Sequence, residues 1–171
     1  MSFNIIMKQK VRQEVERVLH VPGNFTKDIL EMALVIDCSL STEEAGESIR
    51  ELLGTLKKQS EVFRNVRLNA VKWLDDGHIE NQVTSAAVMQ LGRYFEDYKQ
   101  NICVKSMDKL TGYLKKFQAR SKLIIVVSDG NYKIEDEKTV QENLSPFLRR
   151  KMIYWNIKDD TFARGLPGGK V

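Results

Sequence analysis

Two short apolar runs, each followed closely by an aspartate, constrain this chain more than any other feature. The run MALVI at 32–36 is followed by Asp37, and the run LIIVV at 123–127 is followed by Ser128 and Asp129. Continuous apolar runs of this length are typical of strands that are buried on both faces, and such strands belong to parallel sheets covered by helices. The sequence therefore predicts a parallel sheet whose central strands end in acids.

The rest of the chain alternates between helical and strand patterns. Helices are predicted over residues 8–21, 42–60, 87–98, 108–119 and 137–144, with a short helical turn from Ser145-Pro146, and further strands over 66–74, 79–83 and 152–157. Asp76-Gly77 favours a tight hairpin, which makes 79–83 an antiparallel edge strand. We therefore expect an α/β fold, with a doubly wound, mostly parallel sheet, one antiparallel edge strand and helices on both faces.

Length and composition limit the remaining possibilities. The 171 residues suggest one domain at 25–171, preceded by an amphipathic helix and connector at 1–24. No apolar run is long enough for a membrane span or a secretory signal, and a net charge of +4 is weak support for nucleic-acid binding. Cys38 and Cys103 are too few for a disulfide framework and are expected to be small buried residues. A cytoplasmic location is the expectation.

The two strand-terminal acids predict a metal site. Ligands of open α/β sheets bind beyond the carboxyl ends of the strands, where the strand order reverses, so Asp37 and Asp129 are expected to meet there. Two adjacent carboxylates repel unless a positive charge lies between them, and a divalent cation is the simplest source. Ser39 and Ser41 add hydroxyl oxygens at alternate positions, although Ser41 is also placed to cap the next helix. An all-oxygen set favours Mg²⁺, with Mn²⁺ or Ca²⁺ as alternatives.

These motifs resemble those of the von Willebrand factor type A domains that carry a metal-ion-dependent adhesion site. Residues 37–41 (DCSLS) are similar to the family's D-x-S-x-S loop, and Asp129-Gly130 is similar to a later ligand loop. The family's middle loop usually reads Gly-Gly-Thr-Asp, whereas residues 105–108 read KSMD. Met107 would replace the ligating threonine, which leaves Ser106 and Asp108 as additional candidate ligands. The resemblance covers about residues 32–157 and implies a Rossmann-like fold. The family continues with a further strand and a closing helix, and we expect this chain either to lack these elements or to replace them with its N-terminal helix.

The resemblance implies a binding function. We expect a non-enzymatic protein-interaction domain in which an Asp or Glu of a partner protein completes the coordination of Mg²⁺, with no membrane, nucleic-acid or small-molecule substrate. A metal-free docking scaffold on the same fold is the main alternative. A haloacid-dehalogenase-like phosphotransferase would use Asp37 as a nucleophile, but that family has D-x-D-x-T, and its second acid is replaced here by Ser39.

Overall fold

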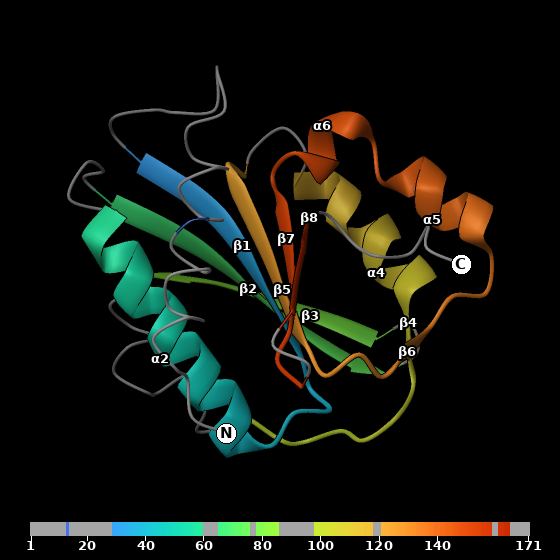
Figure 1. Ribbon diagram of the computed structural model, residues 1–171, viewed down its shortest axis with the longest axis horizontal. Coiled ribbons are helices and arrows are strands. Elements are labelled where there is room, and N and C mark those ends of the chain that lie inside the picture. Colours follow the sequence, from blue (N-terminus) through green and yellow to red (C-terminus); the bar gives the residue numbers. More distant parts are fainter. Residues whose placement is uncertain are drawn as a thin grey trace.

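A six-stranded sheet in the order β3-β2-β1-β5-β7-β8 forms the centre of the molecule (Figure 1). This computed structural model describes residue 13 and residues 29–59, 65–75, 78–85, 98–117, 121–158 and 161–164. The strands of the large sheet are β1 (Ile29–Asp37), β2 (Asn65–Asp75), β3 (His78–Ser85), β5 (Leu123–Ser128), β7 (Met152–Asn156) and β8 (Thr161–Arg164).

The central strands are parallel and both edge strands are antiparallel. β1 pairs in parallel with β2 on one side and with β5 on the other, and β5 pairs in parallel with β7. The strand order therefore reverses between β1 and β5, as expected from their apolar runs. β3 runs antiparallel to β2, as predicted, and β8 runs antiparallel to β7. The expectation of one antiparallel edge and of no strand after residue 157 is wrong, because the four residues of β8, TFAR, pair with residues 153–156 of β7.

Helices cover both faces of the sheet, as predicted. α2 (Thr42–Gln59) lies on one face, whereas α4 (Met107–Leu114), the 3₁₀ turn η3 (Lys115–Phe117), α5 (Glu137–Asn143) and α6 (Pro146–Arg149) lie on the other (Figure 1). Alternate residues of β1 separate the two cores: Leu34 and Ile36 belong to the core that includes Leu52 of α2, and Ala33 and Val35 belong to the core that includes Leu110 of α4.

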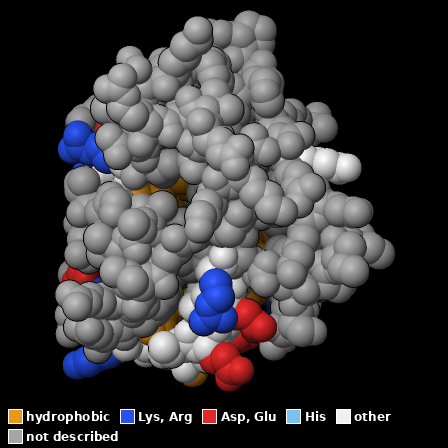
Figure 2. Space-filling model, turned by 90° about the vertical axis from the view of Figure 1, so that its left-hand side faces the viewer, with side chains coloured by type: hydrophobic (Ala, Val, Ile, Leu, Met, Phe, Trp, Pro, Cys, Tyr) orange, Lys and Arg blue, Asp and Glu red, His pale blue; other side chains and the backbone are white. Residues whose placement is uncertain are grey.

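The elements predicted in the described parts of the chain are confirmed, with their ends shifted by a few residues. The predicted helices at 8–21 and 87–98 lie outside the described residues, apart from Gln13 and Tyr98. Trp155 is buried in the core beneath α2, and Trp73 and Phe117 are buried in the core beneath α4. Within the described part, no helix is both long and apolar enough to span a membrane. Figure 2 shows the side of the molecule where α2 lies. Acidic and basic side chains project from this surface, whereas apolar side chains are visible mainly in gaps between other atoms.

A second, two-stranded sheet joins the middle loop to the segment after β5. β4 (Lys105–Ser106) pairs in parallel with β6 (Tyr132–Lys133), with Lys105 opposite Tyr132. This small sheet fixes the backbone of Lys105 close to the carboxyl ends of the central strands. Strands of two residues are too short to show an alternating hydrophobic pattern in the sequence.

The turn after β5 requires a glycine, and a helical glycine provides a matched control. Gly130 has a φ of 86°, and a Cβ added there would lie 2.8 Å from Asn156 Nδ2. We expect Gly130→Ala to lower the free energy of unfolding by about 1–3 kcal/mol, mainly because a side chain strains this backbone conformation. Gly46 lies in α2 with nothing within 4 Å of an added Cβ, so Gly46→Ala should raise it by about 0.5–1 kcal/mol. Urea unfolding of both variants measures the difference, and equal stabilities would contradict the prediction.

Candidate functional site

Asp37 lies at the switch point, fully buried, with hydrogen bonds to both carboxylate oxygens. Its Oδ1 accepts from the backbone N–H of Ser39 at 2.9 Å, and its Oδ2 accepts from the hydroxyl of Ser128 at 2.8 Å. Because Asp37 ends β1 and Ser128 ends the adjacent β5, this contact ties together the two central strand ends. The sequence correctly predicted that the two strand ends would meet.

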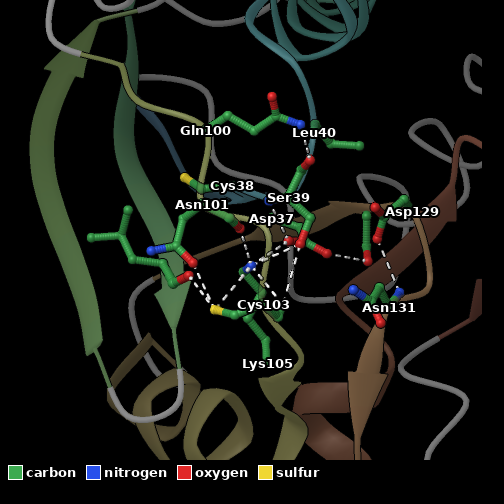
Figure 3. Close-up of polar contacts among 12 residues, drawn as sticks. Asp37, Cys38, Ser39, Leu40, Gln100, Asn101, Cys103, Lys105, Asp129 and Asn131 are labelled. Carbon is green, nitrogen blue, oxygen red and sulfur yellow. Dashed lines mark hydrogen bonds and ion pairs between the residues drawn. The ribbon is translucent and has the colours of Figure 1, made fainter.

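The positive charge beside Asp37 is the ammonium group of Lys105 (Figure 3). Its Nζ lies 3.6 Å from Asp37 Oδ1, and both side chains are 0% exposed. The ammonium donates to the Ser39 hydroxyl at 2.7 Å and to the backbone carbonyls of Asn101 and Cys103 at 2.6 and 3.0 Å. Its three N–H groups therefore all have oxygen partners. Sequence reasoning missed this residue, because the two-residue strand β4 that carries it shows no periodicity and its partner Ser39 is 66 positions away in the sequence.

Burial dominates the electrostatics of Asp37. Removal of the carboxyl from water raises its pKa above the ordinary value. The hydrogen bonds from Ser39 and Ser128 and the charge of Lys105 act in the opposite direction, while the nearby negative charge of Asp129 adds to the increase. The carboxylate is thus held by several donors at once, and its charge depends on them.

Asp129 lies beside this cluster and is held in its own turn. It is partly exposed, and its Oδ1 accepts from the backbone N–H of Asn131 at 2.9 Å (Figure 3). It acts on Asp37 through its charge. Ser128, which precedes Asp129 in the chain, donates to Asp37 and also accepts from the N–H of Gly130.

The candidate ligands Ser39 and Ser41 have different surroundings. Ser39 is buried, and its hydroxyl accepts from Lys105. The hydroxyl of Ser41 accepts from the N–H of Glu44 at 3.1 Å, and the Glu44 carboxylate accepts from the N–H of Ser41 at 3.0 Å. This reciprocal pair is a capping box, which confirms the predicted cap at the start of α2.

The middle-loop candidates hold local structure. Ser106 is the N-cap of α4, where its hydroxyl accepts from the N–H of Lys109. Asp108 accepts from the N–H groups of Glu135 and Asp136 at 2.8 and 2.9 Å, which fixes the loop before α5. Met107 is fully buried in the core beneath α4. The structure brings Asp37, Ser39 and Asp129 together and gives Ser41, Ser106 and Asp108 roles at helix ends and in loops.

The two cysteines differ in exposure. Cys38 is fully buried, as predicted, and burial raises the pKa of its thiol to about 11. Cys103 is only half-buried, so the expectation of a second fully buried cysteine is wrong. Its Sγ lies 2.6 Å from Asn101 Oδ1 and 3.8 Å from Lys105 Nζ. The loop that carries Cys103 reaches the surface, which explains the difference.

The residues around Asp37 do not fit Mg²⁺ as they are arranged. Mg²⁺ requires oxygen ligands at about 2.0–2.1 Å in near-octahedral geometry. The Ser39 hydroxyl and the Asp37 carboxylate already face an ammonium ion, which would repel the metal. Among the described residues, no group of three or more His, Cys, Asp or Glu side chains could hold a metal. Bound Mg²⁺ stays a prediction, and it would require Lys105 to move.

Residues 98–104, named here the rim loop, cover the site and are tied to the end of β1. The Tyr98 hydroxyl donates to the Leu40 carbonyl at 2.7 Å, the Gln100 amide to the Ser39 carbonyl at 2.8 Å, and the Asn101 N–H to the Cys38 carbonyl at 2.7 Å. Two rim-loop side chains face water: Ile102 is 77% exposed and Val104 is 49% exposed, and they are the exposed large hydrophobic residues in the described part of the chain. The rim loop is therefore attached to the end of β1 by hydrogen bonds and exposes two large apolar side chains.

No protein-family model and no curated protein matches this chain. The resemblance to von Willebrand factor type A domains thus continues to rest on the loops at 37–41 and 129–130 and on the order of the elements.

The ion pair of Asp37 and Lys105 should be strongly coupled. Lys105→Met leaves a buried carboxylate without its counter-charge, and Asp37→Asn leaves a buried ammonium, so each should destabilise the fold by about 3–5 kcal/mol. The double variant should lose less than the sum, by about 1–3 kcal/mol, because neither charge is then unpaired. Urea unfolding at neutral pH measures the cycle, and additive losses would show that the two groups do not interact.

The loss of folding stability in Lys105→Met should also depend on pH. Without Lys105 the pKa of Asp37 rises further above its ordinary value of 3.8, because one of the groups that lower it is removed. An acid with a raised pKa in the folded state stabilises the fold at low pH and loses that contribution as pH rises through the folded pKa. The stability deficit relative to wild type should therefore shrink as pH falls from about 7 toward 4. A deficit that stays constant over this range would contradict the assignment.

Proposed function

We propose that this chain is a protein-binding domain with a fold of the von Willebrand factor type A kind, and that it docks its partner on the rim loop without a divalent cation. The observation that carries the proposal is the rigid attachment of the rim loop to the end of β1, with Ile102 and Val104 presented to water. Neighbouring exposed apolar side chains on an ordered loop provide surface that a partner could bury.

The rigidity of the rim loop favours binding energetically. Association costs free energy for every segment that must become ordered, so a loop that is ordered beforehand retains more of its contact energy. Tyr98, Gln100 and Asn101 already hold the rim loop through hydrogen bonds to backbone groups of 38–40. Its backbone conformation need not be built when a partner arrives.

The surroundings of Asp37 support a non-enzymatic function. A phosphotransfer nucleophile needs a carboxylate oxygen that a substrate can reach. Asp37 is fully buried, and both of its oxygens accept hydrogen bonds, while Oδ1 also faces Lys105. No route to attack is open at this carboxylate as it is placed.

Docking of a partner's Asp or Glu through Mg²⁺ is the second candidate. It is supported by the position of Asp37, Ser39 and Asp129 at one end of the sheet, where oxygen ligands are expected. It differs from the first candidate in a measurable way, since chelation would abolish binding.

The test is capture of partners from a lysate of the source cells on the immobilised chain, in Mg²⁺ and in a chelator, followed by binding measurements with the purified partner. Ile102→Asp and Val104→Asp should each weaken binding roughly ten-fold or more, because a charge would be buried in an apolar contact. Ile102→Leu and Val104→Ile are matched controls that keep the apolar surface and should bind like wild type. Thermal melting confirms that all four variants fold.

Two results would contradict the proposal. Wild-type affinity in both aspartate variants would exclude the rim loop as the docking surface. Loss of binding in the chelator, with recovery in Mg²⁺, would instead support the metal-dependent mode.

A further inference from the structure

The oxygen atoms around the Lys105 ammonium form a set that cations generally prefer. They comprise the Asp37 carboxylate at 3.6 Å, the Ser39 hydroxyl at 2.7 Å and the carbonyls of Asn101 and Cys103 at 2.6 and 3.0 Å. Carboxylate, hydroxyl and backbone carbonyl oxygens are the usual ligands of hard cations such as Na⁺, Mg²⁺ and Ca²⁺. Their convergence on one point, from the end of β1 and from the rim loop, is visible in Figure 3.

The two carbonyl oxygens are held in place by other donors besides the ammonium: the Asn101 carbonyl accepts from the N–H of Cys103 at 3.2 Å, and the Cys103 carbonyl accepts from the Ser39 hydroxyl at 3.5 Å. The carbonyls of Asn101 and Cys103 belong to a loop rather than to the sheet, and they turn toward Nζ. A carbonyl oxygen has two lone pairs, so each of these carbonyls can accept from its loop or strand-end donor and still face a cation. If the ammonium were absent, the same oxygens would remain converged around a space of negative potential.

The geometry points to Lys105 as the resident cation of the switch point: its tethered ammonium fills an oxygen-lined cation site, and removal of that side chain opens the site to a free cation. In the wild-type chain the Lys105 ammonium therefore occupies this site, and the site does not bind Mg²⁺. The inference concerns the cation alone, so it does not depend on what the rim loop binds.

The charge balance explains why the ammonium and a metal exclude one another. Among the residues that the structure describes, Asp37 contributes the formal negative charge that pairs with Nζ, and Lys105 neutralises it. A divalent ion on the same oxygens would face a like charge within a few ångströms, in a site where both side chains are 0% exposed and screening by water is weak. Asp129 is held by its own turn and does not supply a contact to Nζ.

The experiment compares thermal melting of wild type, Lys105→Ala and Lys109→Ala during titration with MgCl₂, NaCl and methylammonium chloride. Choline chloride at matched ionic strength serves as the salt control. Lys109 is an exposed lysine of α4, so its replacement removes one positive charge without touching the site. The melting temperature of Lys105→Ala should rise by about 3–6 °C with at least one of the three cations at roughly ten times its Kd, while wild type and Lys109→Ala stay within about 1 °C of the choline control.

The variant Lys105→Ala/Asp37→Asn should lose most of this response, because it removes the one anionic oxygen donor of the site. If Lys105→Ala is unfolded in choline chloride, refolding on addition of one of the cations supports the inference equally. A Lys105→Ala protein that responds to none of the three cations would overturn it.

A second measurement uses the wild-type chain and needs no variant to fold. Mn²⁺ broadens the NMR signals of nuclei near its binding site, so the amide signals of Ser39, Asn101 and Cys103 report on occupancy. We expect no selective broadening at these three amides in wild type. Selective broadening there would show that a metal enters despite Lys105, and would overturn the inference.

Discussion

The buried ion pair between Asp37 and Lys105 is the interaction on which the rest of the site depends. Removing two charges from water is costly, and the pair is tolerated only when the remaining donors and acceptors are also satisfied. Here the carboxylate accepts from Ser39 and Ser128, and the ammonium donates to Ser39, Asn101 and Cys103. These bonds join the ends of β1 and β5 to β4 and the rim loop. The pair therefore fixes how three distant segments meet, as well as balancing charge.

Electrostatic reasoning from the sequence found the requirement for a positive charge but not the lysine that supplies one in the structure. It predicted that acids at the carboxyl ends of the central strands would need a positive charge, and Asp37 has one. It did not find Lys105, because Ser39 and Lys105 are 66 positions apart and the path between them is set by tertiary structure. β4, with only two residues, has no periodicity to place the lysine. Local patterns therefore specify which groups need partners, and long-range packing selects the partners.

The same division holds for the fold. β1 and β5 were predictable because their buried runs have no polar interruption, and α2 because its apolar face and capping box are local features. β8 was not predictable, because a four-residue antiparallel edge strand gains its stability from pairing with β7 and needs no long apolar run. The second antiparallel edge is consistent with this, because edge strands of open sheets are stabilised by one neighbour alone. The two-stranded sheet of β4 and β6 was unpredictable for the same reason.

A tethered ammonium and a metal ion also differ in what they offer a partner. A metal with an open coordination position selects for a carboxylate, and its occupancy varies with the free metal concentration. The Lys105 ammonium is part of the chain, so its occupancy does not depend on solution composition, and its three N–H groups are already used within the fold. Recognition at this rim would then rest on the shape and apolar contact of Ile102 and Val104. If a partner docks on the rim loop as proposed, a buried internal cation would move specificity from coordination chemistry to the surface of the loop that it holds in place.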